Sequence, residues 1–336
     1  MSASEHLVVL ENSLLRVEIL PALGGKIASI QVKRNRLELL QQPLRPYHPR
    51  TLQQSFEDSD ASGSDECLPT IAACAIDWNG QRRNLPDHGD VWRLPCDATI
   101  SENTIAIKVN LFSLPLCLER EIDLRDNSLH IRYRISNIGT LPVPFLWSAH
   151  SLFAVDAGDS IVLPRDISEM MVESSSGNRL GPAGSRISWP HTISTHDHPL
   201  DLSRVLDPKA AVGDKLFASF ADQPPDTSTW CGLYREQHQT GISIAFPTLL
   251  LRSLGLWLCY GGWPQGASHR QQCVAFEPST CPTDSLERSI ETGNAQVLSM
   301  GDSASWTIDW FVHGAAQPIT RQRFEHAAEH FLLSAP

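Results

Sequence analysis

The chain has 336 residues, of which 41% are hydrophobic and 19% are charged, a composition typical of a globular protein with a sizeable core. Its net charge of −11, without a basic cluster, disfavours nucleic acid and anionic membranes as partners. No apolar run reaches the roughly 18 residues of a membrane-spanning helix, and the first residues lack the pattern of a signal peptide. We therefore expect a cytoplasmic protein, built as about two domains of roughly 150 residues or as one large β-sandwich.

Eight cysteines are spread along the chain. None forms a Cys-x-x-Cys pair or has the spacing with histidine that is typical of a zinc site. We therefore expect free thiols, no metal site and no cofactor. A histidine-rich stretch at 191–198 is interpreted as part of a polar loop, because the residues around it are mostly Ser, Gly, Pro and Asp.

In the N-terminal part, residues 7–20 alternate apolar and polar side chains and predict a strand pair. Gly24-Gly25 then permits a sharp bend before the next strand, and the spacing of a phosphate-binding loop is missing. Residues 41–66 are polar and interrupted by prolines. They predict a long connection that ends in the acidic pair Asp65-Glu66.

Residues 104–136 have the strongest strand pattern of the chain. Apolar and polar side chains alternate over 129–136, which predicts a strand buried on one face. The preceding residues 125–128, Arg-Asp-Asn-Ser, have the composition of a turn that closes a hairpin. Strands in series without helices between them indicate an antiparallel sandwich or barrel.

The second half opens with a polar stretch, 173–215, which is predicted to be an excursion from the core. A short amphipathic helix is predicted at 318–333, with Phe324, Ala327, Ala328 and Phe331 on one stripe. Between them, strands are predicted at 242–247, 249–260, 271–277 and 305–312.

Three ionisable residues stand out from these patterns: His88 in a Pro-Asp-His-Gly turn, His150 at the end of an apolar run, and Glu277 just before Pro278. Taken alone, a histidine in an apolar run is usually a core residue with satisfied hydrogen bonds, and a turn histidine is usually solvated. Together, two imidazoles and a carboxylate are suited to proton transfer, since no nucleophile motif, metal spacing or phosphate cradle accompanies them.

Tryptophans lie near all three ionisable residues in the sequence: Trp92, Trp147 and Trp263. The flat face of an indole ring can stack against the C–H face of a sugar ring. The inventory of side chains therefore favours a sugar as the substrate. Trp263, in a Gly-Gly-Trp-Pro turn, can equally be a packing residue of a surface turn.

The turn His88-Gly89, the run from Asn137 to Phe153 that contains His150, and Phe276-Glu277-Pro278 occur in the order of the motifs of the aldose 1-epimerase (galactose mutarotase-like) family. The chain resembles this family over roughly residues 8–313. The resemblance implies an all-β fold, a large antiparallel β-supersandwich with a short C-terminal helix at 318–333. It further implies one β-sandwich domain over 1–336, with the site on the concave face of one sheet.

The resemblance also implies roles for the three residues. Glu277 would be the general base that takes the proton of the anomeric hydroxyl, and His150 the general acid that protonates the ring oxygen. His88 would hydrogen-bond a substrate oxygen. From the stacking argument above, we also expect Trp92, Trp147 and Trp263 to contact the sugar.

The chain departs from the galactose-specific branch of the family at one place. That branch has a Gly-Arg…Asn-Arg-Ile run before the His-Gly turn, which supplies a sugar-binding arginine. Here the sequence Asp65-Glu66-Cys67-Leu68-Pro69-Thr70 stands instead. We therefore expect Asp65 and Glu66 among the substrate-binding residues, and the arginine that contacts sugar, if there is one, could be Arg45, Arg83 or Arg93.

Three functions fit these residues. The first is a cofactor-free aldose 1-epimerase acting on a free aldose, as a monomer or homodimer. The second, a hexose-6-phosphate 1-epimerase, is disfavoured because Asp87 and Asp90 flank His88 and would repel an anion. The third is a carbohydrate-binding protein without activity, which does not require both an acid and a base.

Overall fold

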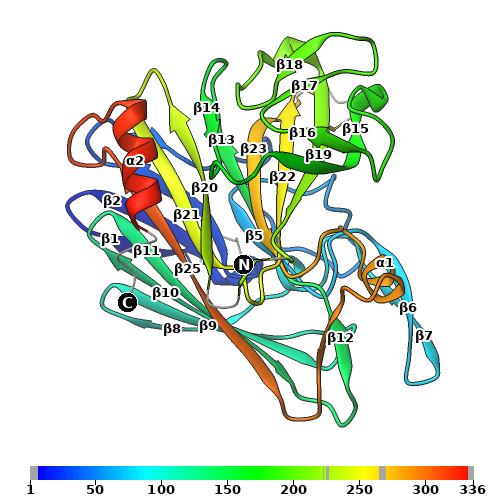
Figure 1. Cartoon of the computed structure of the whole chain (residues 1–336). Helices are drawn as coiled ribbons and strands as arrows, with labels where there is room; N and C mark the ends of the chain where they lie inside the picture. The colour runs from blue at the N-terminus through cyan, green and yellow to red at the C-terminus, as the bar shows by residue number, and fades with distance from the viewer. Residues whose placement is uncertain (1–6, 222, 225–226, 265–269, 332–336) are drawn as a thin grey trace.

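The alternating sequence patterns fold into two antiparallel β-sheets that pack face to face (Figure 1). The structure is a computed structural model that describes residues 7–221, 223–224, 227–264 and 270–331. Within these ranges the larger sheet has eleven strands and the smaller sheet has eight. The predicted fold class, a large antiparallel sandwich with a short C-terminal helix, is confirmed.

The larger sheet has the strand order β1-β2-β3-β5-β13-β23-β22-β19-β15-β16, and β4 pairs with β3 at one side. Its strands are β1 (Val8–Glu11), β2 (Leu15–Leu20), β3 (Lys26–Val32), β4 (Leu37–Glu38), β5 (Ser64–Cys67), β13 (Ser148–Ala154), β15 (Glu169–Ser175), β16 (Arg186–Ser188), β19 (Val212–Ser219), β22 (Ser253–Tyr260) and β23 (Gln272–Ser279).

The smaller sheet has the strand order β14-β20-β21-β25-β11-β10-β9-β8. Its strands are β8 (Asp97–Ser101), β9 (Thr104–Asn110), β10 (Leu116–Arg125), β11 (Ser128–Asn137), β14 (Ser160–Val162), β20 (Ser228–Arg235), β21 (Thr240–Pro247) and β25 (Ser303–His313).

Short ribbons and helices surround the two sheets. The ribbons pair β6 (Cys74–Trp78) with β7 (Gln81–Leu85), β12 (Val143–Phe145) with β24 (Gln296–Leu298), and β17 (His191–Ile193) with β18 (Pro199–Asp201). The α-helices are α1 (Leu286–Glu291) and α2 (Arg321–Phe331). No helix among the described residues is long and apolar enough to cross a membrane.

Strand β11 shows how the sequence determines this fold. Its residues alternate as predicted, with Leu129, Ile131 and Tyr133 buried between the sheets and polar residues between them less buried. It forms a hairpin with β10 in which Arg125 pairs with Ser128, so Asp126-Asn127 is a two-residue turn. Asp126 has a positive φ of 42°, a conformation that Asp tolerates better than most residues.

The core lies between the two sheets and is rich in aromatic residues. Phe153 of the larger sheet meets Trp310 of the smaller sheet, with ring centroids 5.6 Å apart. Trp147 packs against Tyr133 and Trp306, at centroid distances of 5.0 and 4.7 Å. These large, fully enclosed rings bury much of the apolar area that holds the sheets together.

Three predictions about chain segments are wrong in detail. The long connection ends at residue 63, because Ser64–Cys67 forms β5 between β3 and β13. The stretch 173–215 is not a plain loop, since it contains the end of β15, all of β16, the hairpin β17–β18 and the start of β19. The strand predicted at 249–260 begins only at Ser253.

Strand β20 has no counterpart among the predicted strands. All of its residues after Ser228 are buried, so it lacks the alternation of a strand that is buried on one face. One of these residues, Tyr234, stacks on Phe324 of helix α2, drawn red in Figure 1, with ring centroids 5.7 Å apart. The predicted helix at 318–333 is thus present as Arg321–Phe331, while residues 332–333 and the side chain of Phe331 lie outside the described residues.

The two faces of the larger sheet have different surroundings. In β22, Leu254, Leu256 and Leu258 point into the core between the sheets. Because successive side chains of a strand alternate, Gly255 and Trp257 lie on the opposite face, which is turned away from the smaller sheet. We call this second face the site face.

Candidate active site

The site face forms the floor of a cavity of about 310 Å³. All three ionisable residues singled out in the sequence, His88, His150 and Glu277, line it. Its walls come from the connection before β5, the turn 86–89 and the residues that follow β22 and β23. The remaining lining residues are Ser55, Phe56, Glu57, Ile71, Ala72, Asp87, Leu152, Ser174, Lys215, Trp257, Trp263, Gln271 and Asp284.

Strand register brings His150 and Glu277 together. Ser151 of β13 pairs with Phe276 of β23, so His150 and Glu277 occupy facing positions on these antiparallel strands. His150 Nε2 lies 3.9 Å from Glu277 Oε1. The Glu277 side chain is completely enclosed, and its Oε1 atom has no hydrogen-bond partner among the described residues.

A second ion pair holds the other oxygen of Glu277. The ammonium of Lys215 contacts Glu277 Oε2, and its Nζ lies 3.4 Å from Asp284 Oδ1. Lys215 lies on β19, so its side chain crosses β22 to reach Glu277 on β23. Glu277 thus has one oxygen bound to a cation and one oxygen free toward the imidazole.

The turn that carries His88 is shaped by a close backbone approach. His88 and Gly89 both have positive φ, of 57° and 69°. A Cβ atom at residue 89 would lie 2.3 Å from the carbonyl oxygen of Leu68, so only glycine fits. This explains why glycine follows the histidine, and it fixes the direction of the imidazole.

One aromatic ring contacts both imidazoles. Phe56 stacks on His88 with ring centroids 3.7 Å apart and planes 8° apart. The same ring meets His150 edge-on at 5.2 Å, and the two imidazoles are perpendicular to each other at 4.9 Å. Phe56 belongs to the connection 39–63, so this segment covers the cavity rather than hanging free in solvent.

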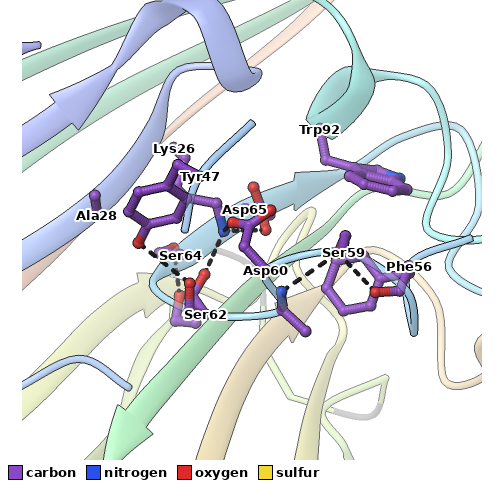
Figure 2. Close-up of polar contacts among 12 residues, drawn as sticks. Lys26, Ala28, Tyr47, Phe56, Ser59, Asp60, Ser62, Ser64, Asp65 and Trp92 are labelled. Atoms are coloured by element: carbon purple, nitrogen blue, oxygen red, sulfur yellow. Dashed lines mark hydrogen bonds and ion pairs between the residues drawn. The ribbon is translucent and has the colours of Figure 1, made fainter. Parts of the chain in front are cut away.

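A buried cluster of charges anchors that connection (Figure 2). Lys26 of β3 lies 2.6 Å from Asp65 Oδ2 and 3.4 Å from Asp60 Oδ2, and all three side chains are almost fully enclosed. Arg50 binds both oxygens of Asp60, at 2.6 and 2.7 Å. With two cations and two carboxylates, the cluster balances its charge, which is the condition for burying ions at a tolerable cost.

The environment moves the proton affinities of His150 and Glu277 toward each other. Burial raises the pKa of the Glu277 carboxyl, and the charge of Lys215 offsets part of this increase. Burial lowers the pKa of the His150 imidazole well below its usual value, and the charges of His88 and Lys215 act in the same direction. Both shifts act against the difference in proton affinity between a free imidazole and a free carboxylate, an arrangement that suits a pair of groups that exchange protons.

Two of the predicted sugar-contacting tryptophans do not line the cavity. Trp147 lies between the sheets, because it is an odd number of residues from His150 and faces the other way. Trp92 is fully buried beneath the connection, where its ring meets Phe56 edge-on at 5.1 Å. Their assignment to substrate binding is wrong, and both support the site from behind. Trp263 does line the cavity.

The acidic pair Asp65-Glu66 is also displaced from the cavity. Asp65 belongs to the anchoring cluster, and Glu66 faces the core between the sheets, where it pairs with Arg120 and accepts a hydrogen bond from Tyr133 at 3.2 Å. Their assignment to substrate binding is wrong as well. Both carboxylates form ion pairs with buried cations, so they are part of the scaffold of the fold.

None of the three candidate arginines lines the cavity. Arg45 is exposed and donates to the carbonyl oxygen of Asp58, and Arg83 lies over the ring of Trp78. Arg93 is buried and donates to the carbonyl oxygens of Gly89 and Gln54. The cation of the cavity is instead Lys215, which no sequence motif marks.

No group of three or more His, Cys, Asp or Glu side chains in the described part of the chain is placed to hold a metal ion. All eight cysteines are free, as predicted. The histidine-rich stretch 191–198 lies largely in the exposed hairpin β17–β18.

No family model matches the chain, and no curated protein matches it in sequence. Solved structures do match. The Slr1438 protein from Synechocystis sp. PCC 6803 aligns with a TM-score of 0.67 at 18% identity, over 92% of this chain and 96% of that chain. A galactose mutarotase related enzyme from Lactobacillus acidophilus aligns with a TM-score of 0.67 at 13% identity, over 94% and 100%.

A candidate aldose 1-epimerase from Escherichia coli K12 is also similar, with a TM-score of 0.65 and 16% identity, over 92% of this chain and 99% of that chain. At these identities the likeness establishes the fold. The chain therefore has the β-sandwich of the aldose 1-epimerase and galactose mutarotase-like proteins, as its motifs predict.

The anchoring cluster generates a stability prediction. Lys26→Met would leave Asp60 and Asp65 with less compensating charge in a buried place, so we expect a loss of about 3–5 kcal/mol in the free energy of unfolding. Lys33→Met is a matched control, because Lys33 pairs with Glu11 at the surface of the same sheet and should cost about 0–1 kcal/mol. Urea unfolding measures both, and equal losses would contradict a structural role for the cluster.

Proposed function

We propose that the protein is an aldose 1-epimerase that interconverts the α and β anomers of a free, uncharged sugar. One observation carries this proposal. The enclosed Glu277 carboxylate presents an oxygen that no described residue hydrogen-bonds, 3.9 Å from an imidazole nitrogen, on the floor of a cavity of about 310 Å³. Leaving a buried acceptor unpaired costs free energy, which a bound hydroxyl would recover.

The proposed reaction needs only proton transfers. Glu277 Oε1 takes the proton from the anomeric hydroxyl while His150 gives a proton to the ring oxygen. The bond between C1 and the ring oxygen breaks and leaves an open-chain aldehyde. Rotation about the C1–C2 bond exposes the other face of the aldehyde, and the reverse transfers close the ring as the opposite anomer.

The pair carries one proton in total during this cycle. It begins on His150, with Glu277 ionised, and after ring opening Glu277 is protonated and His150 is neutral. The two states must be close in free energy for both directions to run. The raised pKa of Glu277 and the lowered pKa of His150 support this balance.

Two other residues of the cavity would bind the sugar. His88, held by Phe56 and by its turn, would hydrogen-bond a substrate oxygen. Trp263 would provide an aromatic platform in the wall. Since every step is a proton transfer by a side chain, we expect anomerisation to need no cofactor.

The charges of the cavity support an uncharged substrate over a sugar phosphate. Among the described lining residues, Lys215 is the only lysine or arginine, and both Glu277 and Asp284 already pair with it. Asp87 and Glu57 add negative charge to the lining. A phosphate group would meet repulsion and find no free lysine or arginine among these described residues.

Replacing the base and the acid tests the proposal. Glu277→Gln keeps the shape but removes the basicity, and His150→Asn removes the proton donor. We expect each to lower kcat by about 10²–10⁴ and to change sugar affinity far less, because the loss lies in the transition state. The double variant should be much less impaired than the product of the single losses, since the two groups act as a unit.

Two residues away from the cavity provide controls. Glu38→Gln alters a half-buried group on the larger sheet and His313→Asn a buried group on the smaller sheet, and both groups hydrogen-bond within the fold. They should lower the melting temperature with little effect on kcat, which is measured by polarimetry. Folded Glu277→Gln and His150→Asn variants with near-parental kcat would contradict the proposal.

Trp263 gives a separate prediction about binding. Saturating sugar should quench or shift tryptophan fluorescence, and a folded Trp263→Ala variant should lose this signal and bind sugar more weakly. An unchanged binding curve in that variant would show that Trp263 only packs against the turn.

A further inference from the structure

Lys215 is the only lysine or arginine among the described residues that line the cavity, and the proposed reaction does not use it. It lies on β19, two strands away from Glu277, and its side chain is 7% exposed. Its ammonium contacts Glu277 Oε2 and lies 3.4 Å from Asp284 Oδ1. A lysine is rarely buried without a specific partner, so this arrangement calls for an explanation.

The backbone leaves a passage for this contact. On β22, between the two residues, Trp257 is opposite Lys215 and Gly255 is opposite Glu277. A Cβ atom at residue 255 would lie 3.2 Å from Glu277 Oε2 and 3.2 Å from the ring of Phe217. The absence of a side chain at Gly255 therefore gives the Glu277 carboxylate the space in which it meets the ammonium.

We propose that Lys215 is a positioning residue that, through its ion pair with Glu277, sets the pH range in which the Glu277–His150 pair is active; the inference rests on the proposed epimerase function. The ion pair selects one oxygen of Glu277 for binding the cation. The other oxygen is left toward His150, so the carboxylate has a single orientation for accepting the proton.

The charges around the pair come from several elements. Lys215 lies on β19, Asp284 on the segment after β23, and His88 in the turn 86–89. Cys67 of β5 and Cys273 of β23 also lie near Glu277, and Lys26 of β3 acts on His150. Among these groups, Lys215 pairs directly with Glu277, and Asp284 pairs with the same ammonium.

The sign of the effect follows from these charges. Besides burial, the positive charge of Lys215 lowers the pKa of both Glu277 and His150, whereas the negative charge of Asp284 raises the pKa of Glu277. The acidic limb of the activity profile reports a second proton entering the pair, and the alkaline limb reports loss of the last proton. Lys215 therefore moves both limbs of the profile to lower pH. Asp284 acts on Glu277 in the opposite direction and moves the acidic limb to higher pH.

The experiment is the pH profile of kcat/KM for anomerisation, measured by polarimetry on the full chain. In Lys215→Met we expect the acidic limb to move upward by about one to three pH units, the range that one nearby charge produces. In Asp284→Asn we expect it to move downward. Lys215→Arg keeps the charge and should leave the profile close to that of the parent protein, and the double variant Lys215→Met with Asp284→Asn should lie between the single variants.

A lysine that only stabilises the fold gives a different result. Its loss would lower the melting temperature and the active fraction at every pH, but the acidic and alkaline limbs of the pH profile would stay at the same pH. This outcome would overturn the inference. If Lys215→Met does not fold, the Asp284→Asn variant tests the inference. An acidic limb that moves to higher pH in this variant, or that does not move, contradicts the inference. A parent protein without any anomerisation would instead contradict the proposed function, so the two failures are distinguishable.

Discussion

The structure around the cavity depends on the burial of one carboxylate. Glu277 is completely enclosed, and an isolated charge in such a place is so costly that the group would be neutral at ordinary pH. The ammonium of Lys215 compensates that charge at one oxygen only. The register of β13, β22, β23 and β19 makes this geometry possible, because it aligns His150, Gly255 and Lys215 around Glu277 on one face of the larger sheet.

Two clusters of buried charge lie on this face, and their balance differs. The cluster of Lys26, Arg50, Asp60 and Asp65 has equal numbers of cations and carboxylates, and it fixes the connection that carries Phe56. The cluster at Glu277 has one lysine for two carboxylates and leaves an oxygen unpaired. The first cluster compensates its own charges, whereas the second keeps an uncompensated carboxylate oxygen beside an imidazole. This contrast explains why Asp65, although it is acidic and lies opposite His150 on the neighbouring strand, belongs to the scaffold.

Sequence periodicity predicts most of the long strands, and the motifs around His88, His150 and Glu277 single out these residues, because each of these signals is local. The periodicity does not predict the face to which a side chain points or its partner, because these depend on neighbours in three dimensions. Trp147 is three residues from His150, so strand alternation places it in the core, and Asp65 and Glu66 point to opposite faces for the same reason. Lys215 lies in a strand pattern where a lysine is normally solvated, and only the register with β22 and β23 reveals its partner. Strand β20 is buried on both faces and therefore has no alternation to detect.

The central claim is that Glu277 and His150 act on opposite sides of the bond that opens in a sugar ring. A crystal structure of the Glu277→Gln variant soaked with a panel of free monosaccharides tests it most directly. The account predicts an aldose in the cavity with its anomeric hydroxyl within hydrogen-bond distance of residue 277 and its ring oxygen facing His150 Nε2. A sugar that binds in the cavity with its anomeric carbon turned away from both residues, or that binds only elsewhere on the protein, would contradict the account.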